Sequence, residues 1–313
     1  MTDKTDRLVT LFGGGGFVGR YALQALLSAG ARVRIAEREP KRAYFLRSLG
    51  RLGQIQFVRA DIGDPASVAA AVAGAEAVVN LVGILKGDFQ RVHVDGAANV
   101  ARAAAAAGAR AFVQVSAIGA DPASPSAYGR SKGEGEAAVR AAFPGATILR
   151  PSIVFGPEDS FVNRFASMAR WFPLLPVIRG SWRVQPIFAA DLGKAIAAAA
   201  LDAQAHGGRT YELGGPNVTT MVELNRWIAR AAGHPRPVFE VPDALAKPMA
   251  RIGSFVPGAP MTWDQWLMLQ SDSVADPDLP GIEAFGIQPT PLEAVAGDWL
   301  ITYRTRGRFA RPA

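Results

Sequence analysis

The feature that most constrains the fold is a run of glycines between a short apolar segment and a helical pattern. Gly13, Gly16 and Gly19 have the spacing G-x-x-G-x-x-G, directly after the apolar run at residues 8–12. A glycine turn lets the backbone approach a pyrophosphate, whose charge then rests on unpaired N–H groups and the positive end of a helix dipole. Such a run alone can be a tight turn, but the joint context favours a bound dinucleotide. The residues predicted to contact it here are Gly13, Gly16, Phe17, Val18 and Gly19.

The first half of the chain alternates short apolar runs with helical patterns, in the rhythm that builds a parallel sheet with right-handed crossovers. The expected strands are Leu8–Phe12, Arg32–Ala36, Ile55–Val58, Ala77–Leu81, Ala111–Val115 and Thr147–Leu149. Helices are expected between them, for example one opened by Asp64 and Pro65 and one over Val94–Ala107. This pattern predicts an α/β chain with a Rossmann-type, doubly wound parallel sheet.

After about Pro151 the regular alternation of strand and helix patterns ends. Glycine and proline become more frequent there, and helical patterns dominate. The expected helices are Ser160–Trp171, Asp191–Ala203, Met221–Ala232 and Pro291–Thr302. Strand-like pieces at Val184–Phe188 and Thr210–Leu213 are expected to return to the first sheet. We therefore predict a dinucleotide-binding domain over residues 1–150, completed by parts of 184–215. An interleaved, smaller, mainly helical lobe over 151–313 is expected to hold a substrate or partner.

Composition excludes several classes of protein. The 313 residues include no cysteine and only three scattered histidines, so neither disulfides nor a metal site is expected. The net charge of +7 is spread along the chain without a lysine-rich tail or an aromatic-studded basic stripe, so no nucleic-acid partner is expected. No segment approaches the roughly 20 apolar residues of a membrane span, and the first ten residues lack the apolar core of a signal peptide. We expect a cytoplasmic protein.

Two adjacent residues at the end of the second expected strand point to different cofactors. Glu37 stands where a carboxylate would accept hydrogen bonds from the adenosine ribose hydroxyls, which favours NAD(H). Arg38 stands where a guanidinium would bind a 2′-phosphate, which favours NADP(H). A surface ion pair between the two is an alternative to both. The residues alone leave the choice open.

Further candidates for cofactor contact follow the third and fourth expected strands. Asp61 and Ile62 are placed to meet the adenine edge, and Leu81, Val82 and Gly83 lie near the middle of the cofactor. Each group could be ordinary turn chemistry at a strand end. The position of both groups at the ends of strands of one expected sheet favours contact with the cofactor.

Tyr128 and Lys132 form a Y-x-x-x-K pair near the start of a helix that follows the fifth strand. Residues four apart share one face of a helix. A nearby ammonium group favours the phenolate, so we expect a lowered pKa for Tyr128 and a role in proton transfer. The lysine can also bind ribose hydroxyls. The Y-x-x-x-K spacing alone often arises by chance. In a chain that begins with a glycine-rich dinucleotide-binding motif, it becomes a strong indication of a catalytic pair.

From Gly13 through Lys132 and onward to Arg150–Pro157, the chain resembles an extended or atypical short-chain dehydrogenase/reductase. The resemblance implies that Tyr128 is the general acid/base and Lys132 its activator. It also implies that Pro151 and Ile153 line the nicotinamide, and that Val115, Tyr128 and Lys132 contact the cofactor.

One departure from that family concerns the end of the fifth strand. Active relatives carry a serine or threonine directly after a first serine, where it hydrogen-bonds the reacting oxygen; here the pair is Ser116 and Ala117. Loss of such a donor can cost on the order of a hundredfold in rate. Ser116 is the remaining catalytic candidate.

A narrower resemblance covers nearly the whole chain. The segments at residues 149–161, 185–191 and above all 279–293 are similar to the nucleotide-binding accessory subunit of respiratory complex I and its bacterial relatives. The third segment is specific because it lies outside any motif that dehydrogenases share. This resemblance implies a structural cofactor, usually NADPH, and a place beside the quinone-reacting part of the complex. Some bacterial relatives are linked to ubiquinone biosynthesis.

Two hypotheses of function follow. The first is an NADP(H)-binding protein, with NAD(H) as the alternative cofactor, that associates with complex I subunits and turns over little or no substrate. The second is an active oxidoreductase or epimerase/dehydratase that uses Tyr128 and Lys132 on a quinone precursor, a sugar nucleotide or a steroid-like alcohol. Ala117 favours the first, and the intact tyrosine–lysine pair favours the second.

The C-terminal lobe contains an apolar stripe at helical spacing, formed by Leu245, Met249, Ile252, Phe255 and Val256. Such stripes usually pack on their own domain, so a core or pocket of the lobe is the favoured interpretation. The alternative is a surface for a partner or for the inner face of the cytoplasmic membrane. The tail supports that alternative, since it carries the four arginines Arg304, Arg306, Arg308 and Arg311 and has no acidic residue after Asp298.

Overall fold

The computed structural model describes residues 7–254, 256, 261–305 and 307–309. The chain divides into two compact units. The first comprises Met1–Pro151, Ala189–Leu213 and Asp276–Gln288, and the second comprises Ser152–Phe188, Gly214–Ala275 and Pro289–Ala313. The backbone therefore passes between the units several times.

The first unit is built on a seven-stranded sheet whose paired strands are all parallel. Its order is β11 (Thr210–Leu213), β6 (Thr147–Pro151), β5 (Ala111–Val115), β4 (Ala77–Asn80), β1 (Leu8–Phe12), β2 (Arg32–Glu37) and β3 (Ile55–Arg59). The chain order reverses between β1 and β4, as in doubly wound folds, which bind ligands at this point. The Rossmann-type prediction is confirmed, and Thr210–Leu213 joins the sheet as expected.

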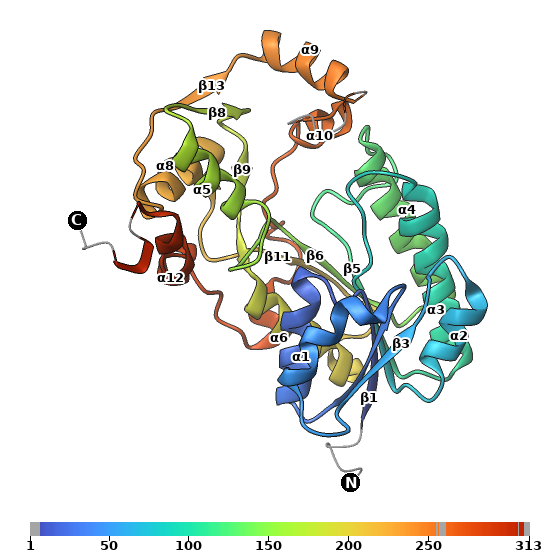
Figure 1. Cartoon of the computed structure of the whole chain (residues 1–313). Coiled ribbons are helices and arrows are strands. Elements are labelled where there is room, and N and C mark those ends of the chain that lie inside the picture. Colours follow the sequence, from blue (N-terminus) through green and yellow to red (C-terminus); the bar gives the residue numbers. More distant parts are fainter. Residues whose placement is uncertain (1–6, 255, 257–260, 306, 310–313) are drawn as a thin grey trace. The chain divides into compact units, whose positions relative to one another are not determined.

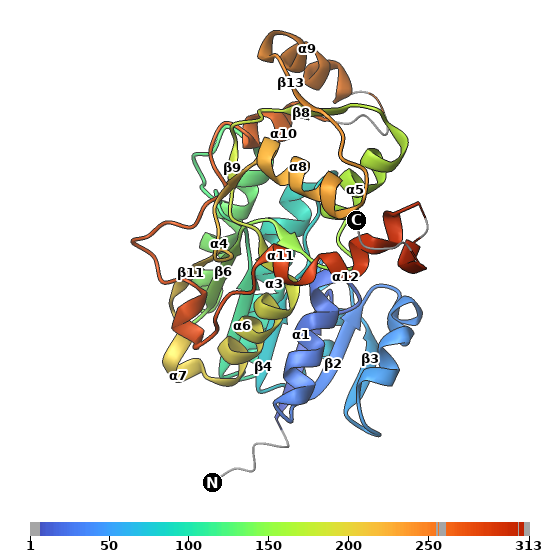
Figure 2. The same cartoon turned by 90° about the vertical axis from the view of Figure 1, so that its left-hand side faces the viewer.

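Helices cover both faces of this sheet (Figures 1 and 2). Helices α1 (Phe17–Ser28) and α6 (Ala189–Leu201) pack together on one face. The other face carries α2 (Pro65–Val72), α3 (Ala97–Ala106) and α4 (Ala127–Ala142). Shorter pieces in this unit are η2 (Pro40–Leu49), α7 (Ala203–His206) and η4 (Ile282–Phe285).

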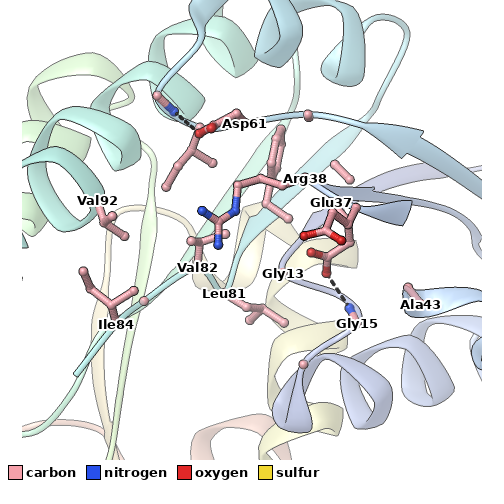
Figure 3. A pocket seen from close by; sticks show the side chains of 18 of the residues that line it. Gly13, Gly15, Glu37, Arg38, Ala43, Asp61, Leu81, Val82, Ile84 and Val92 are labelled. Carbon is pink, nitrogen blue, oxygen red and sulfur yellow. Dashed lines mark hydrogen bonds between the residues drawn. The ribbon is translucent and has the colours of Figure 1, made fainter. Parts of the chain in front are cut away.

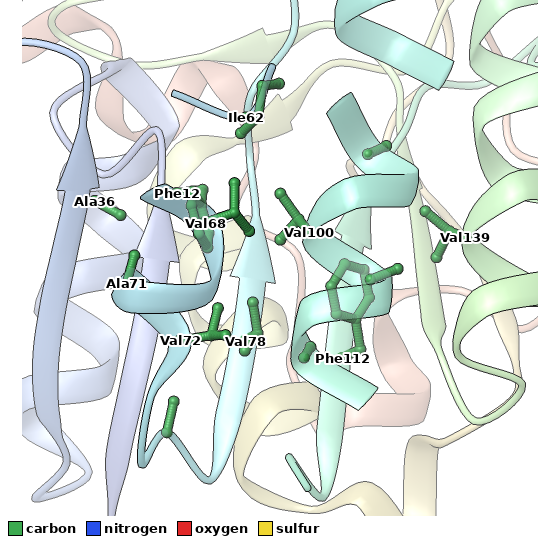
Figure 4. Packing of buried hydrophobic residues seen from close by; sticks show 14 of the residues in the cluster. Phe12, Ala36, Ile62, Val68, Ala71, Val72, Val78, Val100, Phe112 and Val139 are labelled. Atoms are coloured by element: carbon green, nitrogen blue, oxygen red, sulfur yellow. The ribbon is translucent and has the colours of Figure 1, made fainter. Parts of the chain in front are cut away.

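A continuous apolar core lies between the sheet and the helices α2, α3 and α4 (Figure 4). Phe12 and Phe112 rise from the strands and pack against Val68 of α2, Val100 of α3 and their neighbours, all of which are buried. This packing fixes where the carboxyl ends of β1 to β4 stand, and those ends carry the predicted site residues.

The helix expected over Val94–Ala107 begins differently from the prediction. Its first part belongs to a π-helix, η3 (Gln90–Gly96), which continues directly into α3. Gly135 of α4 lies against this segment, and a Cβ there would overlap the carbonyl oxygen of His93. The wide π turn thus brings His93 close to the helix that carries Tyr128 and Lys132.

The second unit combines three small sheets with helices. The strands pair as β7 (Val154–Phe155) with β10 (Ile187–Phe188), β9 (Arg183–Val184) with β12 (Thr219–Thr220), and β8 (Leu175–Ile178) with β13 (Val238–Val241). Its longer helices are α5 (Val162–Trp171), α8 (Met221–Ala231), α9 (Asp243–Gly253) and α10 (Trp263–Met268). The helices α5 and α8 enclose a buried cluster that includes Phe155, Leu224 and Ile228.

Two predictions for this region were wrong. The run Val184–Phe188 does not return to the first sheet, because Pro186 lacks an N–H group and splits it into two short strands of different small sheets. The expected helix Pro291–Thr302 is divided into α11 (Leu292–Val295), α12 (Gly297–Leu300) and η5 (Ile301–Tyr303). A further 3₁₀ turn, η6, covers Gly307–Phe309.

Helix α9 presents its apolar side chains in an unusual way. The small residues Ala246, Ala250 and Gly253 of this helix are buried, and Ala246 and Ala250 pack against Trp266 of α10. The large side chains of the predicted stripe are exposed, with Leu245 at 59% and Ile252 at 66% of full exposure. The favoured interpretation of this stripe as the core of the lobe is therefore wrong for its described members. Phe255 and the tail residues Arg306 and Arg311 lie outside the described residues.

Within the described part of the chain, none of the helices has the length and apolar character needed to cross a membrane.

Candidate functional site

A cavity of about 520 Å³ opens at the carboxyl ends of β1 to β4 (Figure 3). All of the residues that line it belong to the first unit. Nine of the predicted cofactor-binding residues are among them: Gly13, Gly16, Glu37, Arg38, Asp61, Ile62, Leu81, Val82 and Gly83. The cavity therefore lies at the reversal of strand order, where doubly wound sheets hold nucleotides.

The glycine loop has the backbone geometry that its sequence predicts. Gly13 has φ +77°, a left-handed conformation that favours glycine, and its carbonyl oxygen accepts a hydrogen bond from the Gly16 N–H at 3.1 Å. Gly19 lies in the first turn of α1, where a Cβ would stand 2.6 Å from the Gly13 carbonyl oxygen. Gly16 is the N-cap residue of α1 and provides no side-chain cap, so the first N–H groups of the helix are available to an anion.

Glu37 and Arg38 have different environments at the end of β2. The backbone N–H of Gly15 donates a 2.7 Å hydrogen bond to Glu37 Oε1, so this carboxylate already supports the glycine loop. The Arg38 side chain points into the cavity, towards Leu81 and Val82 (Figure 3). The described residues show neither an ion pair between Glu37 and Arg38 nor any other ionic partner for Arg38. The predicted alternative of a surface ion pair is therefore wrong.

The segment after β3 contributes Asp61 and Ile62. Asp61 Oδ1 accepts a hydrogen bond from the Gly63 N–H at 2.9 Å, and Asp61 Oδ2 lies 3.8 Å from Arg91 Nη2. Ile62 is buried and lines the cavity. Arg91 was missed by sequence reasoning because it lies in the π-helix, ahead of the expected helix start. Other lining residues that the sequence analysis missed include Arg42, Ile84 and Val92.

The tyrosine–lysine pair lies on α4, outside the set of cavity-lining residues. Lys132 is buried, and its Nζ donates a 3.1 Å hydrogen bond to the carbonyl oxygen of Val115 at the end of β5. Burial raises the pKa of Tyr128 to about 12 and lowers the pKa of Lys132 to about 8. The expected lowering of the Tyr128 pKa is therefore wrong for this structure. Desolvation of the phenol outweighs any attraction from the ammonium group.

An aromatic cluster surrounds Tyr128. The ring of His93 lies edge to face with the Tyr128 ring at a centroid distance of 5.5 Å and stacks on Phe89 at 5.3 Å. His93 is buried, and burial together with the Lys132 charge lowers its pKa to about 4. Sequence reasoning noted His93 only as one of three scattered histidines. No sequence motif marks it, because its place depends on the π-helix.

The remaining predicted residues lie in different places. Phe17, Val18 and Gly19 form the first turn of α1, and Pro151 ends β6 in the first unit. Ile153 belongs to the second unit. Ser116 directly follows β5, and its buried hydroxyl has no hydrogen-bond partner among the described residues.

The described residues include no group of three or more histidine, cysteine, aspartate or glutamate side chains arranged to hold a metal ion.

The fold and the cavity together define a class. A doubly wound sheet, a glycine loop at the start of α1 and charged residues at the end of β2 are the features of a nicotinamide-dinucleotide-binding protein of the short-chain dehydrogenase/reductase type. In agreement, a family model described as NAD(P)H-binding matches residues 13–159.

Comparisons with known proteins narrow the class. The chain is 35% identical to the mitochondrial NADH dehydrogenase (ubiquinone) 1 alpha subcomplex subunit 9 of Mus musculus, over 95% of this chain and 81% of that protein. It is 37% identical to the ceramide reductase of Caulobacter vibrioides, over 61% of this chain and 60% of that protein. The NADPH-dependent quinone oxidoreductase of Escherichia coli, solved with NADPH, has the same fold, with a TM-score of 0.74, 23% identity and coverage of 92% and 98%.

The chain therefore belongs to the family of the subunit 9 proteins of mitochondrial NADH dehydrogenase, and it has an NAD(P)H-binding domain. The predicted resemblance to the nucleotide-binding accessory subunit of complex I is confirmed. The chain shares its fold with reductases and epimerases of known structure.

Proposed function

We propose that this chain holds NADP(H), in preference to NAD(H), as a structural component and assembles with subunits of a complex I-type NADH dehydrogenase. The single observation that carries the cofactor choice is Arg38. Its guanidinium points into the cavity without an ionic partner among the described residues, while Glu37 is already hydrogen-bonded to Gly15. A 2′-phosphate would supply the missing anion through charge-assisted hydrogen bonds.

Replacement of Arg38 by alanine tests this choice. We expect the Kd for NADPH to rise about 10- to 100-fold, because one charge-assisted contact worth about 1.5–3 kcal/mol is lost. The Kd for NADH should change by less than about threefold, since NADH has no 2′-phosphate. Titration of the cofactor-free protein by fluorescence measures both constants. Arg110→Ala, at an exposed pair with Glu76, is the matched control. Tighter binding of NADH than of NADPH to the unmodified protein would contradict the proposal.

Three features support weak or absent turnover. Ala117 stands where active relatives carry a second hydroxyl, and the Ser116 hydroxyl is buried without a partner in the described part of the chain. The raised pKa of Tyr128 disfavours the phenolate near neutral pH. A rival function as an active reductase is favoured by the intact tyrosine–lysine pair and by the likeness to a ceramide reductase. Robust oxidation of NADPH by a ketone or quinone, abolished by Tyr128→Phe, would support the rival.

Helix α9 also offers a surface through which the chain could dock. We propose that the exposed stripe of α9 contacts the inner face of the cytoplasmic membrane. Leu245, Met249 and Ile252 follow the i, i+4, i+7 spacing of one helix face, and all three are exposed. Lys247 and Arg251 on the same helix supply positive charge that complements anionic lipid.

Co-sedimentation with vesicles tests this surface. The unmodified protein should pellet with vesicles that contain phosphatidylserine, less with neutral vesicles, and less at high salt. Leu245→Gln combined with Ile252→Gln should reduce pelleting at least about fivefold, because each side chain loses the burial of its apolar surface in lipid. A matched control is Leu52→Gln together with Leu85→Gln, two exposed leucines of the first unit. Equal pelleting of both double variants would show that the stripe does not contact lipid.

A further inference from the structure

One buried side chain connects two parts of the first unit that carry predicted cofactor contacts. His93 Nε2 accepts a 3.0 Å hydrogen bond from the backbone N–H of Ile84, which follows Gly83 on the wall of the cavity. On the other side of the ring, Nδ1 lies 2.9 Å from Ser131 Oγ. Ser131 Oγ in turn donates a 2.8 Å hydrogen bond to the carbonyl oxygen of Tyr128. The imidazole therefore bridges the end of β4 and the helix α4.

These contacts define the state of the ring. The backbone N–H of Ile84 can only donate, so Nε2 must be the unprotonated acceptor. A neutral imidazole carries one proton, which must then be on Nδ1 and is donated to Ser131 Oγ. The hydrogen bonds run in one direction, from Ile84 to His93 and onward through Ser131. Burial and the nearby Lys132 charge lower the pKa of His93 to about 4, so this neutral form persists at neutral pH.

The packing around His93 fixes the plane of the ring. Phe89 stacks on it with an interplanar angle of 13°, and Tyr128 meets it edge to face at 88°. A Cβ on Gly83 would lie 3.6 Å from His93 Nε2 and 3.8 Å from Lys132 Nζ. The cavity wall, the histidine and the lysine thus meet at Gly83. In this arrangement, a shift of the ring would move the cavity wall and the tyrosine–lysine helix relative to each other.

Resting on the proposed dinucleotide function, we propose that His93 is a positioning residue for the nicotinamide end of the cofactor. By bridging Ile84 and Ser131, it holds the wall after β4 at a fixed distance from Tyr128 and Lys132. The nicotinamide and its ribose occupy the space that these two elements border. The adenosine end is held independently by the glycine loop and the residues after β2.

His93→Phe separates this role from general packing. A phenyl ring retains the stack on Phe89 and the edge contact with Tyr128 but loses both hydrogen bonds. We expect about tenfold weaker binding of NADPH, while 2′-phospho-ADP-ribose, which lacks nicotinamide, binds within about twofold of the unmodified protein. The emission of the bound reduced nicotinamide should shift towards that of the free cofactor. Isothermal titration and fluorescence give both readouts.

His93→Gln serves as the conservative variant, because a primary amide offers one acceptor for Ile84 and one donor for Ser131. It should restore NADPH affinity to within about threefold. Unchanged NADPH binding by His93→Phe, or an equal loss with both probes, would overturn the inference. Failure of the unmodified protein to bind NADPH at all would instead overturn the proposed function, and the inference with it.

Discussion

Gly19→Ala is expected to abolish dinucleotide binding, with at least about a hundredfold increase in the Kd for NADPH. The added Cβ would stand 2.6 Å from the carbonyl oxygen of Gly13 and within the same distance of the Gly14 carbonyl carbon. Both atoms belong to the backbone, so relief requires the glycine loop to move away from α1. That movement would displace the N–H groups that we propose bind the pyrophosphate.

Gly297→Ala is the matched control for this substitution. It makes the same chemical change in a helix, but the added Cβ would have no atom within 4 Å. Its Kd for NADPH should stay within about twofold of the unmodified protein. Circular dichroism checks that the Gly19 variant retains its helices and strands. Normal NADPH binding by a folded Gly19→Ala protein would mean that the glycine loop does not hold the pyrophosphate.

The sequence was most informative where local pattern and sheet topology agree. The strands of the first sheet start and end within about two residues of their predicted bounds, because short apolar runs between glycine and helix signals leave little freedom. Glu37 and Asp61 could be placed near the glycine loop because they stand at the ends of the second and third expected strands. The carboxyl ends of neighbouring parallel strands must meet at one edge of the sheet.

The parts that the sequence could not predict depend on packing in three dimensions. The backbone hydrogen bonds of a π-helix span five residues, one more than in an α-helix. The apolar spacing of η3 therefore does not follow the α-helical period, and both Arg91 and His93 were missed. The pKa of Tyr128 is raised because the side chain is buried, and Phe89 and His93 pack against its ring. The residues next to Tyr128 in the sequence give no sign of this burial.

Helix α9 shows a second limit of periodicity. Its sequence contains two stripes at helical spacing, one of large and one of small apolar residues. The hydrophobic period cannot tell which of them faces the protein. Ala246 and Ala250 pack against the rest of the lobe because small side chains permit close approach to Trp266. The larger stripe, which hydropathy alone would bury, is the one that remains exposed.

A buried ionic network provides the largest expected effect on stability. Arg150 of β6 forms two hydrogen bonds with Glu136 of α4, at 2.9 and 2.7 Å, and one with Glu212 of β11, at 3.3 Å. Both carboxylates are buried, and Glu212 Oε2 also accepts the backbone N–H of Asp276 at 3.0 Å. One guanidinium thus pairs with two buried carboxylates and links a helix to the edge of the sheet. The Glu136 contact raises the pKa of Arg150, so the cation persists at every accessible pH.

Arg150→Met should lower the free energy of unfolding by about 3–5 kcal/mol at pH 7, since it removes the guanidinium that pairs with two buried carboxylates. Urea unfolding at pH 7 measures this loss. Arg110→Met, at the exposed pair with Glu76 (3.9 Å), should change stability by less than about 0.5 kcal/mol. A loss for Arg150→Met no larger than for Arg110→Met would show that the network does not stabilise the fold.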